Sequence, residues 1–259
     1  MSDSIQSKIG PLRSTMLLTL HTHHAARIWQ GRPASENKPP IMSFSRFIGL
    51  MGRINFDAQR DDPYADFWLI RIEEKLQHCK AELAHIHQEV NLLMSEMPSA
   101  ISVQENFSVR PASLPIFVGS KLGFLAVYLL ITYDDIVRRL LHVHHVSLIG
   151  RRATESRIDG ASHVLRSLFG LAQKYKISGV TRADFAANND RAREAKEAFG
   201  ELPLDVLEGR RRAEFAPQIL VGRKRDDRAV SAAVVKPVVW GGVASGNALV
   251  QVIADALEG

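Results

Sequence analysis

Three groups of histidines are the residues whose types and spacing first suggest chemistry, because imidazole nitrogens can bind zinc. On a helix only residues three or four apart share a face, which selects a single pair, His142 and His145. On a strand, His21 and His23 would share a face. The chain has one cysteine and no His-Glu-x-x-His motif. We therefore predict no metal site. The groups are His21, His23 and His24; His85 and His87; and His142, His144 and His145.

Two pairs of adjacent carboxylates, Asp61-Asp62 and Asp134-Asp135, are the next candidates for chemistry. Each pair lies where the sequence predicts the start of a helix, so helix capping explains both without catalysis. The glycine-rich stretch 241–246 lacks the Gly-Lys-Ser/Thr ending of a phosphate-binding loop, and no nucleophile elbow is visible. We predict that the protein is not an enzyme, has no catalytic residues and needs no cofactor.

Composition restricts the class of protein further. The 259 residues allow one large domain or two small ones, and the net charge of +5 permits nucleic-acid binding without requiring it. The longest apolar run, 122–131, is half the length of about twenty residues that a membrane helix needs. The first ten residues are polar and do not form a secretion signal. These features predict a cytoplasmic protein with no membrane partner.

The N-terminal part of the chain alternates between strand and loop signals. Residues 12–22 predict a strand, in which Met16, Leu18 and Leu20 alternate with threonines and His21. Residues 31–40 are rich in glycine and proline and predict a loop after it. Residues 44–54 predict a short helix.

The stretch 63–97 gives the strongest helix signal. It contains no internal glycine or proline, and Asp62 followed by Pro63 is typical of a helix start. Apolar residues recur at steps of three and four, which predicts a long amphipathic helix. Such a helix is suited to docking a partner.

The rest of the chain predicts mostly helices. Residues 107–119 are extended but carry Pro111 and Pro115, and a helical region covers 122–209. Within it, Thr132 is expected to cap a second helix, and 181–184 form a capping box at the start of a helix that ends at Gly200. We predict a mainly α member of the α+β class. A single domain would span 10–217, between flexible tails at 1–9 and 218–259.

Several sequence blocks together resemble the integrating conjugative element protein family, long known as a domain of unknown function. The resemblance covers about 10–217. It implies a role beside genes for conjugative transfer, and a relationship to a transcriptional activator of transfer genes with a ribbon-helix-helix DNA-binding fold. The blocks are 20–32 (LHTHHAARIWQGR), 61–66 (DDPYAD), 122–130 (LGFLAVYLL) and 166–171 (RSLFGL), followed by 201–203 (ELP) and 205–209 (DVLEG).

A ribbon-helix-helix protein is a dimer in which one strand from each subunit pairs, and the ribbon enters the major groove. Two segments compete for this role. Residues 12–22 form the better strand, but a loop rather than a helix is expected after them. Residues 107–119 are followed directly by two predicted helices meeting at Thr132, but their prolines make a poor ribbon. We favour 12–22, whose outward side chains predict base contacts by Arg13, Thr15, Thr19 and His21.

The resemblance therefore predicts a sequence-specific, double-stranded DNA-binding regulator of conjugative transfer genes, acting as a homodimer in the nucleoid, with other regulators of conjugation as further partners. One alternative is a structural or adaptor protein of the conjugation machinery that docks through its long helix. Another is a metal-dependent DNA-processing enzyme. The residues predicted to contact phosphates are Lys121, Arg138, Arg139, Arg151 and Arg152.

Overall fold

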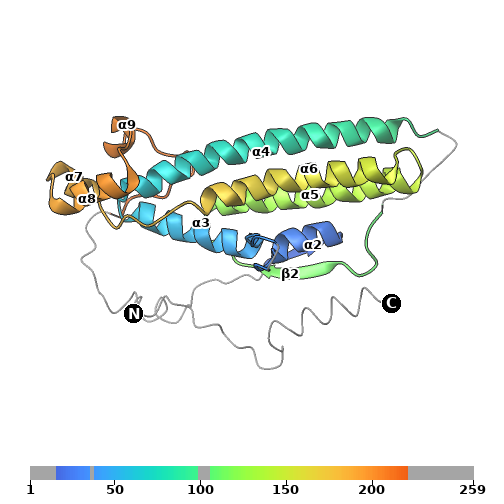
Figure 1. The fold of residues 1–259 in the computed structure, drawn as a ribbon, viewed down its shortest axis with the longest axis horizontal. Helices are drawn as coiled ribbons and strands as arrows, with labels where there is room; N and C mark the ends of the chain where they lie inside the picture. The colour runs from blue at the N-terminus through green and yellow to red at the C-terminus, as the bar shows by residue number, and fades with distance from the viewer. Residues whose placement is uncertain (1–15, 36–37, 99–105, 221–259) are drawn as a thin grey trace, which may run out of the picture. The chain divides into compact units, whose positions relative to one another are not determined.

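The computed structural model describes residues 16–35, 38–98 and 106–220. The chain divides into two units, Met1–Val221 and Gly222–Gly259, and the described fold belongs to the first. This fold is mainly helical with one small antiparallel sheet (Figure 1), which confirms the predicted α+β class. The elements are β1 (Met16–Leu20), α2 (His23–Gln30), α3 (Phe44–Gln59), α4 (Pro63–Ser95), β2 (Ala112–Ile116), α5 (Lys121–His145), α6 (Arg151–Ala172), α7 (Arg182–Ala186), α8 (Asp190–Phe199) and α9 (Leu204–Leu207).

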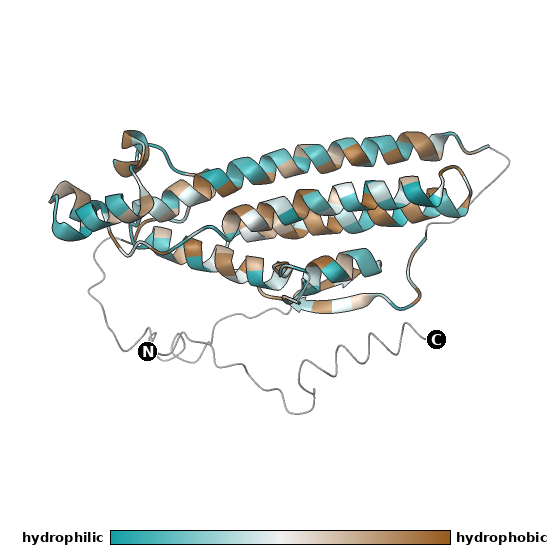
Figure 2. Ribbon diagram, viewed as in Figure 1, coloured by the Kyte–Doolittle hydropathy of each residue, from teal (hydrophilic) through white to brown (hydrophobic). Residues whose placement is uncertain are grey.

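Three long helices, α4, α5 and α6, pack along one another and form the body of the fold (Figure 1). The predicted start of α4 is confirmed: Pro63 is its first residue, and the Asp62 carboxylate accepts hydrogen bonds from the amides of Tyr64 (2.9 Å) and Ala65 (3.2 Å). Apolar and polar positions alternate along α4 (Figure 2), and the helix packs against α3, α5 and α6. In the described part of the chain, no helix is both long and apolar enough to cross a membrane.

Helix α2 packs on α5 and α6, and α3 packs on these two helices and on α4 (Figure 1). Aromatic rings make this contact: Phe44 and Phe47 of α3 both lie against Phe169 of α6, with ring centroids 5.7 and 4.9 Å apart, and Trp29 of α2 packs on Phe44. These rings join one apolar core that includes residues of both strands and of helices α2 to α6.

The three short helices α7, α8 and α9 lie at the end of the bundle where α4 begins (Figure 1). The Tyr64 hydroxyl donates to the carbonyl oxygen of Gly200 at 2.7 Å. The fully buried Asp66 carboxylate is held by Arg182 at 2.7 Å and by a bidentate contact with Arg212 at 2.8 and 2.9 Å. A buried carboxylate needs such pairing, because an unpaired charge away from water is costly.

The structure uses both ribbon candidates, 12–22 and 107–119, as the two strands of one sheet. β1 comes from the first candidate and β2 from the second, and they pair with each other, antiparallel, within one chain. The expectation that a single segment would pair with its copy in a second subunit is therefore not what the structure shows. Both candidates carried real strand signals, but the sequence did not indicate that each is the other's partner.

Two helix predictions are wrong. The chain does not break at Thr132, because α5 runs without interruption and the Thr132 hydroxyl donates back to the carbonyl of Tyr128 at 2.9 Å. Asp134 and Asp135 therefore lie in the middle of a helix and do not cap one. A loop was expected directly after β1, but helix α2 comes first. Its N-cap, Thr22, accepts a hydrogen bond from the Ala25 amide.

The C-terminal helices follow the local signals more closely. The capping box at Thr181 and Asp184 is confirmed, but the helix that it opens ends early, at α7. Asn188 has a positive φ of 46°, and Asn189 caps the separate helix α8. The Leu220 amide donates to the carbonyl of Gln59 at 2.9 Å, so the chain stays attached to the fold up to that point. The predicted tail at 1–9 and most of the one at 218–259 lie outside the described residues.

Candidate nucleic-acid interface

The two-stranded sheet presents one face to solvent and buries the other. Leu18, Leu20 and Leu114 point into the core and are 4%, 1% and 8% exposed. The opposite face carries Leu17, which is 62% exposed, and its partner Pro115, and next to them the directly paired Thr19 and Ser113. The register therefore places two exposed hydroxyl groups side by side at the centre of the outer face. Hydroxyl groups can donate to or accept from base edges.

One buried carboxylate fixes the end of this ribbon. Asp134 of α5 accepts hydrogen bonds from the amide of His21 (2.8 Å), the amide of Thr22 (3.0 Å) and the hydroxyl of Thr22 (2.6 Å). Asp134 is 4% exposed. The corner between β1 and α2 is thus tied to the middle of α5, which sets where the outer face of β1 points.

His21, a predicted base reader, has a packing role in the described structure. Its ring lies edge-on to Phe107, with centroids 5.1 Å apart, and its Nδ1 atom is buried with no hydrogen-bond partner among the described residues. The Arg138 guanidinium lies over the Phe107 ring, 4.1 Å from its centroid. These three side chains join the end of β1, the segment before β2 and helix α5.

Arg138 and Arg139, predicted to contact phosphates, both bind Asp135. Arg139 donates to this carboxylate at 2.7 Å, Arg138 donates to its other oxygen, and His87 of α4 contacts it at 3.0 Å. Burial favours the neutral acid, but the hydrogen bonds from Arg139, His87 and Arg138 outweigh it and hold the pKa of Asp135 below its usual value. The cluster joins α4 to α5, and both guanidinium groups are largely engaged in it.

The remaining predicted residues lie in three different places. Lys121 opens α5 just after β2, with its ammonium 5.8 Å from the ring centroid of Phe215. Arg151 and Arg152 begin α6 and are exposed; Arg151 is 83% exposed and pairs with Glu155 at 2.8 Å. Arg13 and Thr15 lie outside the described residues.

The sequence reasoning missed two sets of exposed polar residues. Ser113 was overlooked because the segment 107–119, which contains prolines, was the less favoured ribbon. The alternation of residues around Leu114 could nevertheless have indicated that Ser113 faces outward. Arg46, Arg53 and Arg60 were also overlooked. They follow one another at seven-residue steps through α3 and its C-cap, and all three are exposed. A seven-residue step returns to nearly the same face of a helix.

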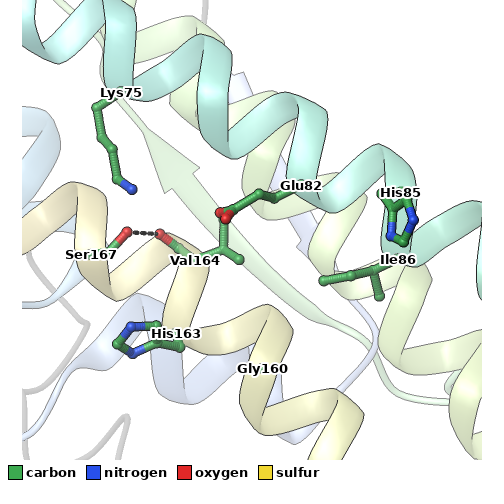
Figure 3. Close-up of a pocket in the computed structure, with 8 residues that line it drawn as sticks. All are labelled: Lys75, Glu82, His85, Ile86, Gly160, His163, Val164 and Ser167. Atoms are coloured by element: carbon green, nitrogen blue, oxygen red, sulfur yellow. Dashed lines mark hydrogen bonds between the residues drawn. The ribbon is translucent and has the colours of Figure 1, made fainter.

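One histidine of α4 and one of α6 line a groove between these two helices (Figure 3). His85 and Glu82 come from α4, and His163 comes from α6, beside the exposed Gly160. In the described ranges, however, no three His, Cys, Asp or Glu side chains are grouped so that they could hold a metal ion. The groove therefore offers polar lining groups without a metal-binding arrangement.

The fold is that of a mainly helical α+β protein with an exposed two-stranded ribbon. Comparison with known families identifies the kind of protein. Residues 8–220 match the family model described as transcriptional regulator AcaB. Because the match spans most of the chain, the protein belongs to the AcaB family of transcriptional regulators. This confirms the resemblance to a conjugative element family seen in the sequence.

Two further comparisons accompany the family match. The crystal structure of AcaB from uropathogenic E. coli is similar, with 15% sequence identity, a TM-score of 0.49, and an alignment covering 76% of this chain and 98% of that one. No curated protein matches the chain.

Proposed function

We propose that this transcriptional regulator binds double-stranded DNA sequence-specifically and controls genes for conjugative transfer. The observation that carries the proposal is the outer face of the β1–β2 ribbon, with Thr19 and Ser113 exposed side by side. The major groove of DNA admits a two-stranded ribbon, and each base pair displays a distinct pattern of donors and acceptors there. Thr19 and Ser113 would read base edges in this arrangement, together with Arg13 and Thr15 from the preceding segment.

Phosphate contacts would supply much of the affinity and hold the ribbon in register. Among the predicted phosphate contacts, Lys121, Arg151 and Arg152 are exposed and keep this proposed role. Arg138 and Arg139 are engaged by Asp135, and we assign them mainly to holding α4 and α5 together. We assign His21 to a packing role as well, because its ring contacts Phe107 at the end of β1.

The proposal includes a homodimer, for which the sequence offers two grounds. The first, that a two-stranded ribbon is only marginally stable by itself, carries little weight here because the ribbon packs on its own helices. The remaining support is that regulators of this kind commonly bind two-fold symmetric operators as dimers. The mass of the protein–DNA complex, measured by light scattering, tests the number of copies bound.

The adaptor alternative receives less support from the structure. The long helix α4 was the expected docking surface, yet α3, α5 and α6 of the same chain pack against it. Its outer side is mostly charged or polar, although Leu92 is 68% exposed. An adaptor that docks through the apolar side of this helix would have to open the bundle.

The test is a fluorescence anisotropy titration of the full chain against promoter fragments of conjugative-transfer genes and a random duplex of equal length. We expect clearly tighter binding to at least one promoter. Thr19→Val and Ser113→Ala should each reduce that discrimination by about 2- to 13-fold, the range for losing one hydrogen bond of about 0.5–1.5 kcal/mol. Ser156→Ala, which removes an exposed hydroxyl from α6, is the matched control.

Two results would refute this assignment. Equal binding to promoters and random DNA would remove the sequence-specific role. Promoter discrimination that survives both ribbon substitutions would show that bases are read by another part of the chain.

A further inference from the structure

The exposed side of α3 carries a row of arginines, Arg46, Arg53 and Arg60. At 100° per residue, a seven-residue step rotates the side chain by about 20° from its starting direction, so the three lie along one stripe. Fourteen residue steps separate its two ends, which is about 21 Å at 1.5 Å per residue. We name these three residues the α3 stripe.

The α3 stripe has little neighbouring negative charge on its own helix. Asp57 is the one acidic residue within Phe44–Gln59, and it is 3% exposed. It accepts hydrogen bonds from Arg53 at 3.3 Å and from the Tyr175 hydroxyl at 2.8 Å. Within the described part of the chain, Arg46 and Arg60 have no carboxylate partner, and Arg60 lies over the Phe56 ring.

Neighbouring helices add further positive charge. Burial raises the pKa of the Tyr133 hydroxyl, and the positive charges of Arg166 on α6 and Arg27 on α2 partly offset this. Both arginines are exposed. Asp159 of α6 also acts on this hydroxyl and reduces the net charge there. Both arginines belong to helices, α2 and α6, that contact α3.

Two glycines in the middle of α3 give a second, independent observation. Gly49 and Gly52 have helical neighbours on both sides, and glycine inside a helix is less favourable than alanine. A Cβ atom added at either position would meet nothing within 4 Å among the described residues. Packing within the described fold therefore does not require these glycines. Gly49 lies three residues after Arg46 and four before Arg53, so it leaves a gap between two arginines.

We propose that the α3 stripe is a phosphate-contacting surface for duplex DNA, with Gly49 allowing the sugar–phosphate backbone to approach the helix closely. A DNA strand offers a regular row of negative charges, which a row of exposed arginines on a rigid helix complements. This inference rests on the proposed function and adds to it a face that contacts the backbone independently of sequence.

The test is the salt dependence of binding to a labelled random-sequence 30-base-pair duplex. Arg46→Ala/Arg60→Ala removes two cations and leaves Arg53 to neutralise Asp57. Each lost phosphate contact should reduce the slope of log affinity against log salt by about 0.9, so the double variant should lose about 1.8. Its affinity deficit should then be about tenfold larger at 50 mM than at 200 mM salt.

Lys80→Ala/Lys196→Ala is the charge-matched control, because it removes two exposed cations from α4 and α8, one of which lies over an aromatic ring. We expect it to keep the wild-type slope within about 0.5, less than one phosphate contact. Equal slopes for the two double variants would overturn the inference while leaving the proposed function intact. A wild-type chain that binds no duplex at all would overturn both.

Gly49→Leu separates this role from a structural one. Leucine is a better helix former than glycine, so the urea midpoint of the variant should not fall. Its affinity for the same duplex should nevertheless fall at least fivefold, because the added side chain fills the gap between the arginines. Wild-type affinity in a stable Gly49→Leu protein would overturn the close approach of DNA to α3.

Discussion

The hydrogen bonds of Asp134 make its replacement the most informative test of how the ribbon is positioned. Asp134→Ala removes the acceptor for two backbone amides and the Thr22 hydroxyl. These groups lie 112 and 113 residues away in sequence, so the substitution breaks the tie between β1, α2 and α5 rather than a local contact. We expect a loss of stability together with weaker DNA binding.

The magnitude follows from the groups left without a partner. Each buried, unsatisfied amide costs about 1–3 kcal/mol, which gives about 2–6 kcal/mol for two. His21 is only partly buried, so water can reach its amide and reduce the cost. We expect about 3 kcal/mol for Asp134→Ala and about 1–2 kcal/mol for Asp134→Asn, whose amide oxygen still accepts. Domains of ordinary stability, about 5–15 kcal/mol, would remain folded.

The assay is urea unfolding followed by circular dichroism, with Asp159→Ala as the control because that carboxylate is exposed on α6. We expect the control to stay within about 0.5 kcal/mol of the wild type. Affinity for the promoter should fall in Asp134→Ala under conditions where circular dichroism shows it to be folded. A loss of stability below about 1 kcal/mol would refute the reasoning, because it would mean that the corner is held by other contacts.

Two further predictions concern backbone geometry and pH. Gly31 ends α2 with a φ of 67° and a ψ of −159°, and an added Cβ would lie 2.5 Å from the carbonyl oxygen of Ile41. Gly31→Ala should therefore lower stability by about 2–4 kcal/mol in urea unfolding, whereas Gly170→Ala, at an exposed helical glycine with open space, should not lower it. The hydrogen bonds to Asp135, led by Arg139, hold its folded pKa below the unfolded value despite burial. Its charge therefore stabilises the fold above the unfolded pKa of about 3.9, and this is lost as pH falls through the folded pKa. Asp135→Asn should cost about 1–2 kcal/mol at pH 7, and its urea midpoint should approach that of the wild type at about pH 3; a constant difference would contradict the assignment.

Part of the candidate interface could be predicted from the sequence. Alternation around Leu18 and Leu20 predicted that Thr19 would face outward, and the structure exposes it. The same rule would have identified Ser113 if the second strand had been given equal weight. The outward direction of a strand residue depends on its immediate neighbours, which is why this part was readable.

The roles of Arg138 and Arg139 could not be read in the same way. A pair of arginines in a basic stretch resembles a phosphate-binding site whether it faces solvent or a carboxylate. Asp135 precedes Arg138 by three residues and Arg139 by four, whereas His87 and Asn91 reach the cluster from α4. Only the packing of α4 against α5 shows that these guanidinium groups are engaged.

The sequence by itself determined the elements whose signals are local. Asp62 and Pro63 start α4, Thr181 and Asp184 form a capping box, and the threonine-rich alternation before His21 forms a strand. Each signal depends on hydrogen bonds or side-chain directions within a few residues, and such interactions form in the same way wherever the segment lies.

The tertiary structure alone decided which elements meet. It paired Thr19 with Ser113, placed Asp134 beneath the corner of β1, and continued α5 through Thr132, where local capping chemistry favoured a break. These outcomes depend on contacts between segments about a hundred residues apart. The free energy of burying both strands and helices α2 to α6 in one core outweighs the small local preferences at any single position.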